Sequence, residues 1–278
     1  MNKIISTHIK SKLILANLPN SVICRDLNIP KLGLGTIRYG RDWPKNKTDN
    51  KMLTQVETNT NLNTFLDAGV MMVDTAACYG ISEEKLGNFF KEKTYRHYLN
   101  QVFIATKWGL VFNPSNNGSD VNHSIRNLHE SFRISSDLLP RVDLFYTHKA
   151  NAIVLCNTGI KNTLLKFQSA GKIKWIGASI TKTDDFSEVF HKRKILSNYV
   201  QFIQTGPEVL DKYPDMIKTL HKEGIAIVIN SPFSRNQSFK SGLESYKSIL
   251  KNPNVSFVLM SSNKEKHIQE NLDLASIH

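Results

Sequence analysis

Short apolar runs alternate with amphipathic segments from residue 31 almost to the end of the chain. The apolar runs are brief and rich in β-branched or aromatic residues, as expected of strands that are buried on both faces. The pattern predicts strands at Leu32–Thr36, Val70–Asp74, Val102–Lys107, Val142–His148, Ile173–Ser179, Tyr199–Gln204, Ile225–Asn230 and Ser256–Met260. Strands of this kind belong to a mainly parallel sheet.

The segments between these runs have the spacing of amphipathic helices. Met52–Ala68 carries apolar residues at helical intervals and is followed by Gly69, a typical helix end. Ser82 is a plausible N-terminal cap for the next helix. Further helices are predicted at Val121–Ser135, Ile160–Ser169, Asp184–His191, Asp211–Lys222, Ser241–Lys251 and Lys264–Ala275.

A series of strand–helix units without a break in composition favours a single α/β fold, a closed (β/α)8 TIM barrel over residues 31–278. The alternative is a doubly wound open sheet, which usually carries a GxGxxG turn after its first strand. The glycines of KLGLGTIRYG lack that spacing. Residues 1–30 are predicted to form a short extension or a hairpin that closes the barrel floor. The polar segments 113–120 and 232–241 are predicted loops, either shaping access to the rim or acting as connectors.

Composition narrows the class of protein. The chain has 278 residues and a net charge of +12, and no apolar stretch approaches the roughly 20 residues that span a bilayer. We therefore expect a cytoplasmic protein without a membrane partner. The basic residues are spread along the chain and do not interleave with aromatics, so a solvated surface is favoured over a nucleic-acid interface.

Cysteine usage predicts neither a disulfide framework nor a metal site. The three cysteines are scattered, and no CxxC pair is present. Cys78 is of interest because it lies between Asp74 and Tyr79. A small residue in a packed turn is the favoured interpretation of Cys78, and a reactive thiol is the alternative.

Four ionisable side chains lie at or just after the ends of three predicted strands: Asp74, Tyr79, Lys107 and His148. In a parallel barrel these ends converge on one rim, where catalysis takes place. A tyrosine hydroxyl can protonate the oxygen of a carbonyl under reduction, and a nearby ammonium lowers its pKa from the ordinary value near 10. An aspartate can hold the lysine, and a histidine can orient the substrate oxygen. Each residue taken singly is more often structural.

Several segments resemble one known family. GVMMVDTAACYGISEEKLGNFF resembles the signature of the aldo-keto reductases, while FIATKWG and RVDLFYTHKA resemble the lysine and histidine strands of that family. GKIKWIGASI, YVQF, GIAIVINSPF and VLMSSNKEKHIQENL resemble later segments in the same order. The resemblance covers about Leu32 to Leu272. LGLGTIRYGRDWP and FIATKWGLVFNPSN are similar to the branch that includes sugar (aldose) dehydrogenases.

The resemblance implies a nicotinamide cofactor extended across the C-terminal rim of the barrel. It also implies that Tyr79 donates and accepts the proton, that Lys107 and Asp74 tune it, and that His148 orients the carbonyl. The implied cofactor-binding residues are Thr36, Ser179, Gln201, Ser231, Ser262, His267, Glu270 and Asn271. Candidate walls of the substrate pocket are Trp43, Trp108 and Phe112, with barrel packing as the alternative.

The chain departs from the family pattern at three cofactor positions. Ile180 stands where many members have asparagine, and Asn230 stands where an aromatic commonly stacks on the nicotinamide. His267 replaces the arginine that commonly binds the 2′-phosphate, and Lys264 and Lys266 either compensate or are surface charges. NADP(H) is favoured over NAD(H).

Two functions follow as hypotheses. The first is an oxidoreductase that interconverts an aldehyde, ketone or sugar with its alcohol by hydride transfer, with Tyr79 as general acid and base. The alternative is a nicotinamide-nucleotide-binding sensor or regulatory subunit with little turnover, suggested by Ile180 and Asn230. The sequence indicates a small-molecule partner but neither its identity nor the oligomeric state.

Overall fold

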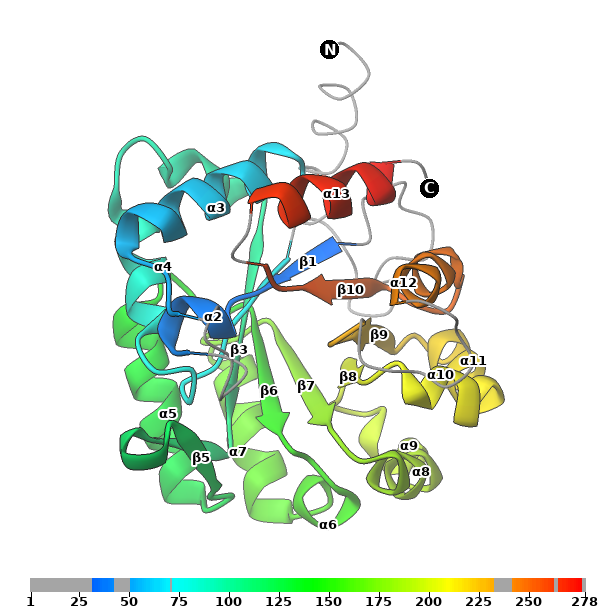
Figure 1. Ribbon diagram of the computed structural model, residues 1–278. Helices are drawn as coiled ribbons and strands as arrows, with labels where there is room; N and C mark the ends of the chain where they lie inside the picture. Colours follow the sequence, from blue (N-terminus) through cyan, green and yellow to red (C-terminus); the bar gives the residue numbers. More distant parts are fainter. Residues whose placement is uncertain (1–31, 43–50, 71, 233–241, 263–264, 277–278) are drawn as a thin grey trace.

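The computed structural model describes residues 32–42, 51–70, 72–232, 242–262 and 265–276. In this part of the chain, eight parallel strands close a barrel in the order β1-β10-β9-β8-β7-β6-β3-β2 (Figure 1). They are β1 (Leu32–Gly35), β2 (Met72–Asp74), β3 (Phe103–Trp108), β6 (Leu144–His148), β7 (Trp175–Ile180), β8 (Phe202–Thr205), β9 (Ala226–Ile229) and β10 (Phe257–Met260). The predicted closed barrel is confirmed, and the open sheet is wrong. The extension predicted over residues 1–30 and the pocket residue Trp43 lie outside the described residues.

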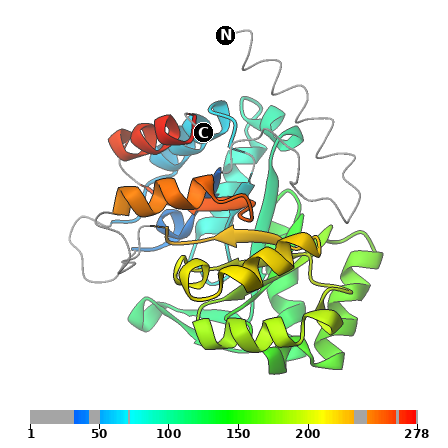
Figure 2. The ribbon, with the colours of Figure 1, turned by 90° about the vertical axis from the view of Figure 1, so that its right-hand side faces the viewer.

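Helices surround the barrel on its outside (Figures 1 and 2). They are α2 (Ile37–Gly40), α3 (Gln55–Asp67), α4 (Ser82–Lys91), α5 (Ile125–Leu138), α6 (Ala152–Leu155), α7 (Thr158–Ser169), α8 (Thr183–His191), α9 (Arg193–Leu196), α10 (Glu208–Lys212), α11 (Pro214–Lys222), α12 (Gly242–Lys251) and α13 (Glu265–Ser276), with 3-10 turns η1 (Arg96–Asn100) and η2 (Pro114–Asn116). None of the helices described here is long and apolar enough to cross a membrane.

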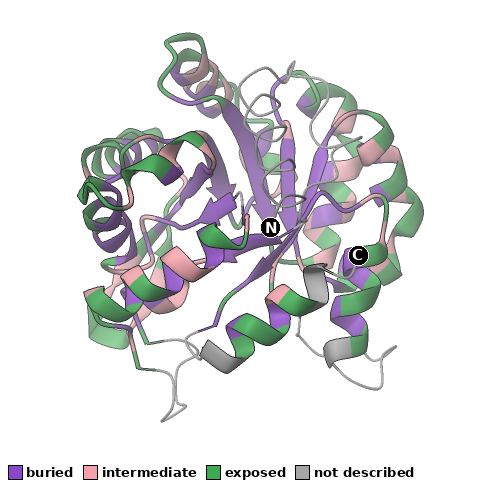
Figure 3. Ribbon diagram, turned by 90° about the horizontal axis from the view of Figure 1, so that it is seen from above, coloured by how far each residue is buried: buried purple, intermediate pink, exposed green. Residues whose placement is uncertain are grey.

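The period of two along each strand divides the core into two layers. Side chains that point outward pack against the helices, and those that point inward fill the barrel, including Met72, Phe103, Tyr146 and Phe202. Gly177 makes room for this filling, since a Cβ there would lie 2.4 Å from the Tyr146 ring. Viewed from above, the strands form a buried centre and the exposed residues lie on the outer helix faces (Figure 3).

Helix starts depend on local capping that the apolar pattern locates only approximately. Helix α3 begins at Gln55, after the predicted Met52, because Thr54 and Glu57 form a capping box. Helix α4 begins at Ser82 as expected, but the Ser82 side chain makes no cap hydrogen bond. Its hydroxyl bonds Thr36 instead, so the predicted capping role is wrong.

The polar segment that follows Lys107 folds into a hairpin. Strands β4 (Leu110–Asn113) and β5 (Gly118–Val121) pair antiparallel, and Asn117 turns the chain with a φ of 47°. Because Val121 belongs to β5, helix α5 begins only at Ile125, after the Ser124 cap. The predicted loop over residues 113–120 is therefore an ordered hairpin. The second predicted loop, over residues 232–241, lies almost entirely outside the described residues.

Candidate active site

The carboxyl ends of the barrel strands bring a set of polar side chains together. Asp74, Lys107 and His148 lie an even number of residues after the inward-facing Met72, Phe103 and Leu144, so all three point into the barrel at one rim. Ser179 on β7 and Gln204 on β8 also lie an even number of residues after inward-facing residues, Trp175 and Phe202, and they are paired in register. The rim is therefore the polar end of a cylinder that is apolar below.

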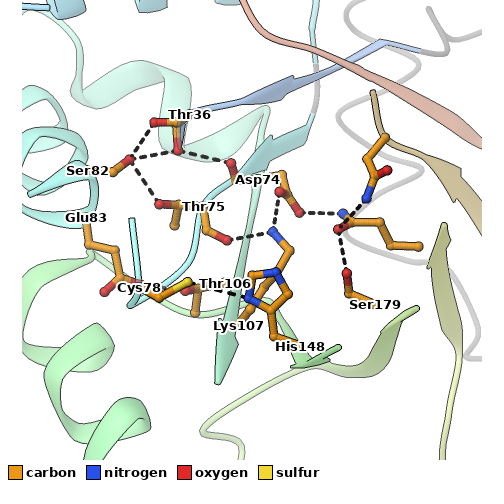
Figure 4. A network of polar contacts seen from close by, with 12 residues as sticks. Thr36, Asp74, Thr75, Cys78, Ser82, Glu83, Thr106, Lys107, His148 and Ser179 are labelled. Carbon is orange, nitrogen blue, oxygen red and sulfur yellow. Dashed lines mark hydrogen bonds and ion pairs between the residues drawn. The ribbon is translucent and has the colours of Figure 1, made fainter. Parts of the chain in front are cut away.

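Asp74 and Lys107 form a buried ion pair (Figure 4). The Lys107 ammonium also donates to the carbonyl oxygen of Thr75 at 2.8 Å, and the Gln204 amide donates to the second Asp74 oxygen at 2.8 Å. The two charged residues are only 2% and 1% exposed. Burial raises the pKa of Asp74, against the opposing effects of Lys107 and Gln204.

Tyr79 lies beside this pair, in the turn that follows β2. The Lys107 nitrogen is 5.1 Å from the centre of the Tyr79 ring, and the His148 ring meets it edge-on with centroids 6.0 Å apart. Burial raises the pKa of Tyr79 well above 10, with a further contribution from Asp74 and an opposing one from Arg41. The lowering effect expected of Lys107 does not dominate, because burial acts more strongly on this pKa and the Lys107 charge is paired with Asp74.

His148 is a neutral imidazole. Burial lowers its pKa well below 6.5, and the cations Lys107, Lys149 and Arg41 act in the same direction. Its Nδ1 lies 3.6 Å from the sulfur of Cys78. Its carbonyl oxygen accepts from Nε2 of His123 at 2.8 Å, which fixes the backbone at the end of β6.

Hydroxyl groups brace the turn that carries Tyr79. Thr36 donates to the carbonyl of Asp74 at 3.0 Å, and the Ser82 hydroxyl lies 2.9 Å from that of Thr36 (Figure 4). Gly40 allows the close approach, since a Cβ there would lie 1.8 Å from the Tyr79 carbonyl oxygen. Thr36 is fully buried and bonded within this network, so its side chain braces the rim, and its role in cofactor binding stays a prediction.

Ser179 lies on the rim as expected, but Gln201 does not. Gln201 precedes β8 and accepts from the backbone of Ile176, near the start of β7, at the opposite end of the barrel. The rim glutamine is Gln204, whose side-chain oxygen accepts from Ser179 at 3.0 Å and from Asn230 at 3.5 Å. The inward parity of Phe202 was the sequence signal that could have identified Gln204.

The other predicted cofactor residues follow β9 and β10 or lie on α13. Ser231 follows β9, is exposed and has a φ of 49°, while Ser262 follows β10 and is buried. His267 and Glu270 are exposed on α13, and Asn271 on the same helix is buried.

The predicted pocket residues Trp108 and Phe112 lie in different environments. Trp108 is fully buried, packs edge-on against His123 and belongs to the layer between barrel and helices. Its role as a pocket wall is wrong, because the strand period that turns Lys107 inward turns Trp108 outward. Phe112 packs with Tyr79 against a small buried cluster and so lies next to the rim.

With this fold and this rim, the chain is an α/β barrel of a recognised type. Residues 31–243 match the model of the aldo/keto reductase family, and the chain belongs to that family.

Individual relatives are distant. Aldo-keto reductase str7 of Strobilurus tenacellus is 25% identical over 225 residues, covering 78% of this chain and 62% of that protein. Aldo-keto reductase YhdN of Bacillus subtilis is 29% identical over 184 residues, covering 61% of this chain and 50% of that protein. The chain therefore spans between half and about three fifths of the length of these curated relatives.

Solved structures share the fold. A proposed aldo-keto reductase from Pseudomonas aeruginosa superposes with a TM-score of 0.71 at 20% identity, covering 89% of this chain and 90% of that chain. The holo form of aldo-keto reductase AKR11C1 from Bacillus halodurans gives a TM-score of 0.67 at 15% identity, covering 88% of this chain and 86% of that chain.

Proposed function

We propose that the protein is a nicotinamide-dependent oxidoreductase that interconverts a carbonyl (an aldehyde, a ketone or a sugar) and its alcohol. The observation that carries the proposal is the gathering of Tyr79, the buried Lys107–Asp74 pair and neutral His148 on one rim. Family membership supports the same reaction class.

Proton delivery is assigned to Tyr79. Its raised pKa keeps the phenol protonated at neutral pH, so the acid form needed for carbonyl reduction is present. As charge develops on the substrate oxygen, the proton passes from the phenol to that oxygen, and the Lys107 ammonium near the ring stabilises the resulting phenolate. In the reverse direction the phenolate takes the proton from the alcohol.

His148 is assigned to orient the substrate oxygen. A neutral imidazole has one N–H and can donate it without adding a charge to the site. Phe112, packed beside Tyr79, is proposed as a pocket wall that contacts the apolar face of a substrate or a sugar ring.

The donor set fits a nicotinamide group. Ser179, Gln204 and Asn230 form a row of hydroxyl and amide groups along three neighbouring strands, and such groups match a carboxamide. Asn230 is partly exposed at the end of β9, and the exposed Ser231 turns the chain there. When bound, the nicotinamide cofactor supplies or accepts the hydride.

NADP(H) is proposed as the preferred form of the cofactor. His267 is exposed on α13 and stands where the family resemblance implies contact with the 2′-phosphate. Asn230, in place of a stacking aromatic, offers less contact area to the nicotinamide ring. We therefore expect moderate affinity and rapid exchange of the cofactor.

The second candidate, a cofactor-binding sensor with little turnover, is favoured by Ile180 and Asn230, which replace residues that commonly contact the nicotinamide in the family. A screen of aldehydes, ketones and sugars with NADPH and NADH separates the two, combined with a fluorescence titration of each cofactor. The oxidoreductase proposal predicts turnover of at least one class, faster with NADPH. Binding of NADPH without turnover of any compound would favour the sensor, and absence of binding would contradict both.

A further inference from the structure

Cys78 occupies a position that the proposed mechanism does not use. It directly precedes Tyr79, is 1% exposed and packs with Ala76 and Leu110. Its sulfur lies 3.6 Å from Nδ1 of His148, within the range of a hydrogen bond to sulfur (Figure 4). The thiol therefore contacts the one imidazole of the rim, from the side that bears Nδ1.

The protonation states of the two groups limit this hydrogen bond to two possible directions. A neutral imidazole carries a proton on one nitrogen and a lone pair on the other. Burial and neighbouring cations keep the pKa of His148 low, and burial raises the pKa of Cys78, so the imidazole is neutral and the thiol keeps its proton. Either Nδ1–H donates to the sulfur, or S–H donates to Nδ1 and the imidazole proton is then on Nε2; the contacts around Cys78 favour donation by S–H.

Further donors reinforce this direction from the β4–β5 hairpin. Arg41 donates from Nη1 to the Ser119 hydroxyl oxygen at 3.1 Å and to the Gly118 carbonyl at 3.2 Å. The Ser119 hydroxyl in turn hydrogen-bonds Cys78 and acts to lower its pKa, against the effect of burial. Since a guanidinium can only donate, the sequence of donors runs from Arg41 through Ser119 and Cys78 to His148.

We propose that Cys78 is a positioning residue that fixes His148 as the Nε2–H tautomer, leaving that N–H to donate to the substrate oxygen. The last step rests on the proposed function, because it requires a substrate carbonyl at the rim. The tautomer itself is a property of the protein alone. If Cys78 is only a small residue that fills a packed turn, removing its S–H leaves the tautomer unchanged.

The tautomer can be measured directly by NMR on protein labelled with 15N-histidine, because protonated and unprotonated ring nitrogens differ widely in chemical shift. The His148 signals are assigned by their loss in His148→Asn. We expect wild type to show a protonated Nε2 and an unprotonated Nδ1. Cys78→Ala should give a mixture of tautomers, and Cys78→Ser, which keeps a donor, should restore the wild-type pattern at least partly.

Cys156→Ala is the matched control, since it removes a thiol from an exposed position at the end of α6. It should leave the His148 signals unchanged. The inference is overturned if wild-type His148 carries its proton on Nδ1, or if Cys78→Ala keeps the wild-type tautomer. A Cys78→Ala protein that fails to fold leaves the Ser variant and the wild-type spectrum as tests.

Turnover provides a second measurement that separates this inference from the proposed function. Cys78→Ala should lower kcat roughly three- to tenfold, the range expected for one hydrogen bond, with the cofactor Kd unchanged. A Cys78-dependent tautomer in a protein without any carbonyl turnover would contradict the proposed function and leave the tautomer assignment standing. Normal turnover in wild type with a Cys78-independent tautomer would overturn only the inference.

Discussion

At the scale of single residues, the buried Lys107–Asp74 pair is the feature on which the rim depends. Each charge is compensated: the ammonium by Asp74 and the Thr75 carbonyl, and the carboxylate by Lys107 and Gln204. Removing one partner of such a pair costs more than the pair contributes, because an uncompensated charge stays buried. The pair therefore fixes the arrangement of the rim, and the loss of either partner is expected to destabilise the folded protein.

Lys107→Met tests both consequences. We expect loss of most turnover and a decrease of about 3–5 kcal/mol in the free energy of unfolding, since Asp74 keeps only the Gln204 donor. Chemical denaturation and steady-state assays measure the two effects. Lys251→Met is the control, because Lys251 is exposed on α12. A Lys107→Met protein with wild-type stability and rate would show that the pair has neither function.

The sequence identified the four rim groups because each stands at, or shortly after, the end of an apolar run. The prediction failed where the alternation of inward-facing and outward-facing residues along a strand was not taken into account. Gln201 was taken in place of Gln204, although Phe202 faces inward and only even steps from it reach the same face. Trp108 was placed in the pocket although it follows the inward Lys107. The Cys78–His148 contact joins two distant segments, and no local pattern predicts it.

At the scale of elements, helix α4 uses its first turn for contacts with other elements. Glu83 accepts hydrogen bonds from Thr106 on β3 and from Ser135 on α5, both to the same carboxyl oxygen. The side chain is 2% exposed, and burial raises its pKa against the effect of these two donors. Glu83 thus connects two helices to the strand that carries Lys107.

The raised pKa of Glu83 makes stability depend on pH. Above the ordinary value of 4.5, the unfolded chain releases this proton while the folded protein retains it, so stability falls as pH rises toward the folded pKa. Glu83→Gln keeps an oxygen for both donors and removes this titration. The Tm difference between Glu83→Gln and wild type should therefore be more positive at pH 8 than at pH 5.

Thermal denaturation at the two pH values measures this difference. Glu84→Gln serves as the control, since it removes the same charge from an exposed position on the same helix. Its Tm should stay close to that of wild type at both pH values. A constant difference between Glu83→Gln and wild type across the range would contradict the argument.

The strands were predicted from their apolar runs, and α3 was predicted from apolar residues at helical intervals. The exact ends of the elements depended on local capping residues and on adjacent segments that form elements of their own. The polar residues 113–120 were taken as a loop, whereas Pro114–Asn116 and Asn117 form the turn of a hairpin and Gly118 begins β5. The segment Asp211–Lys222 is divided because Pro214 begins a new helix, α11, after α10 has ended.

At the scale of the whole molecule, the order of strands around the barrel follows their order in the chain. Each strand end therefore reaches the same rim, although residues that meet there are far apart in the chain, such as Asp74 and Gln204, which are 130 positions apart. The alternation of strands and helices predicted an α/β fold. Closure of the sheet could be favoured from the sequence, but only the pairing of β1 with β10 establishes it.

The central claim is that the Tyr79 phenol delivers the proton at this rim. Tyr79→Phe keeps the ring, and with it the contacts to His148 and Lys107, but removes the hydroxyl. The most direct test measures turnover of a carbonyl substrate by this variant, together with its cofactor Kd. We predict that kcat falls by roughly a hundredfold or more while the Kd stays within about twofold of wild type. A variant that reduces the substrate at the wild-type rate would contradict the account.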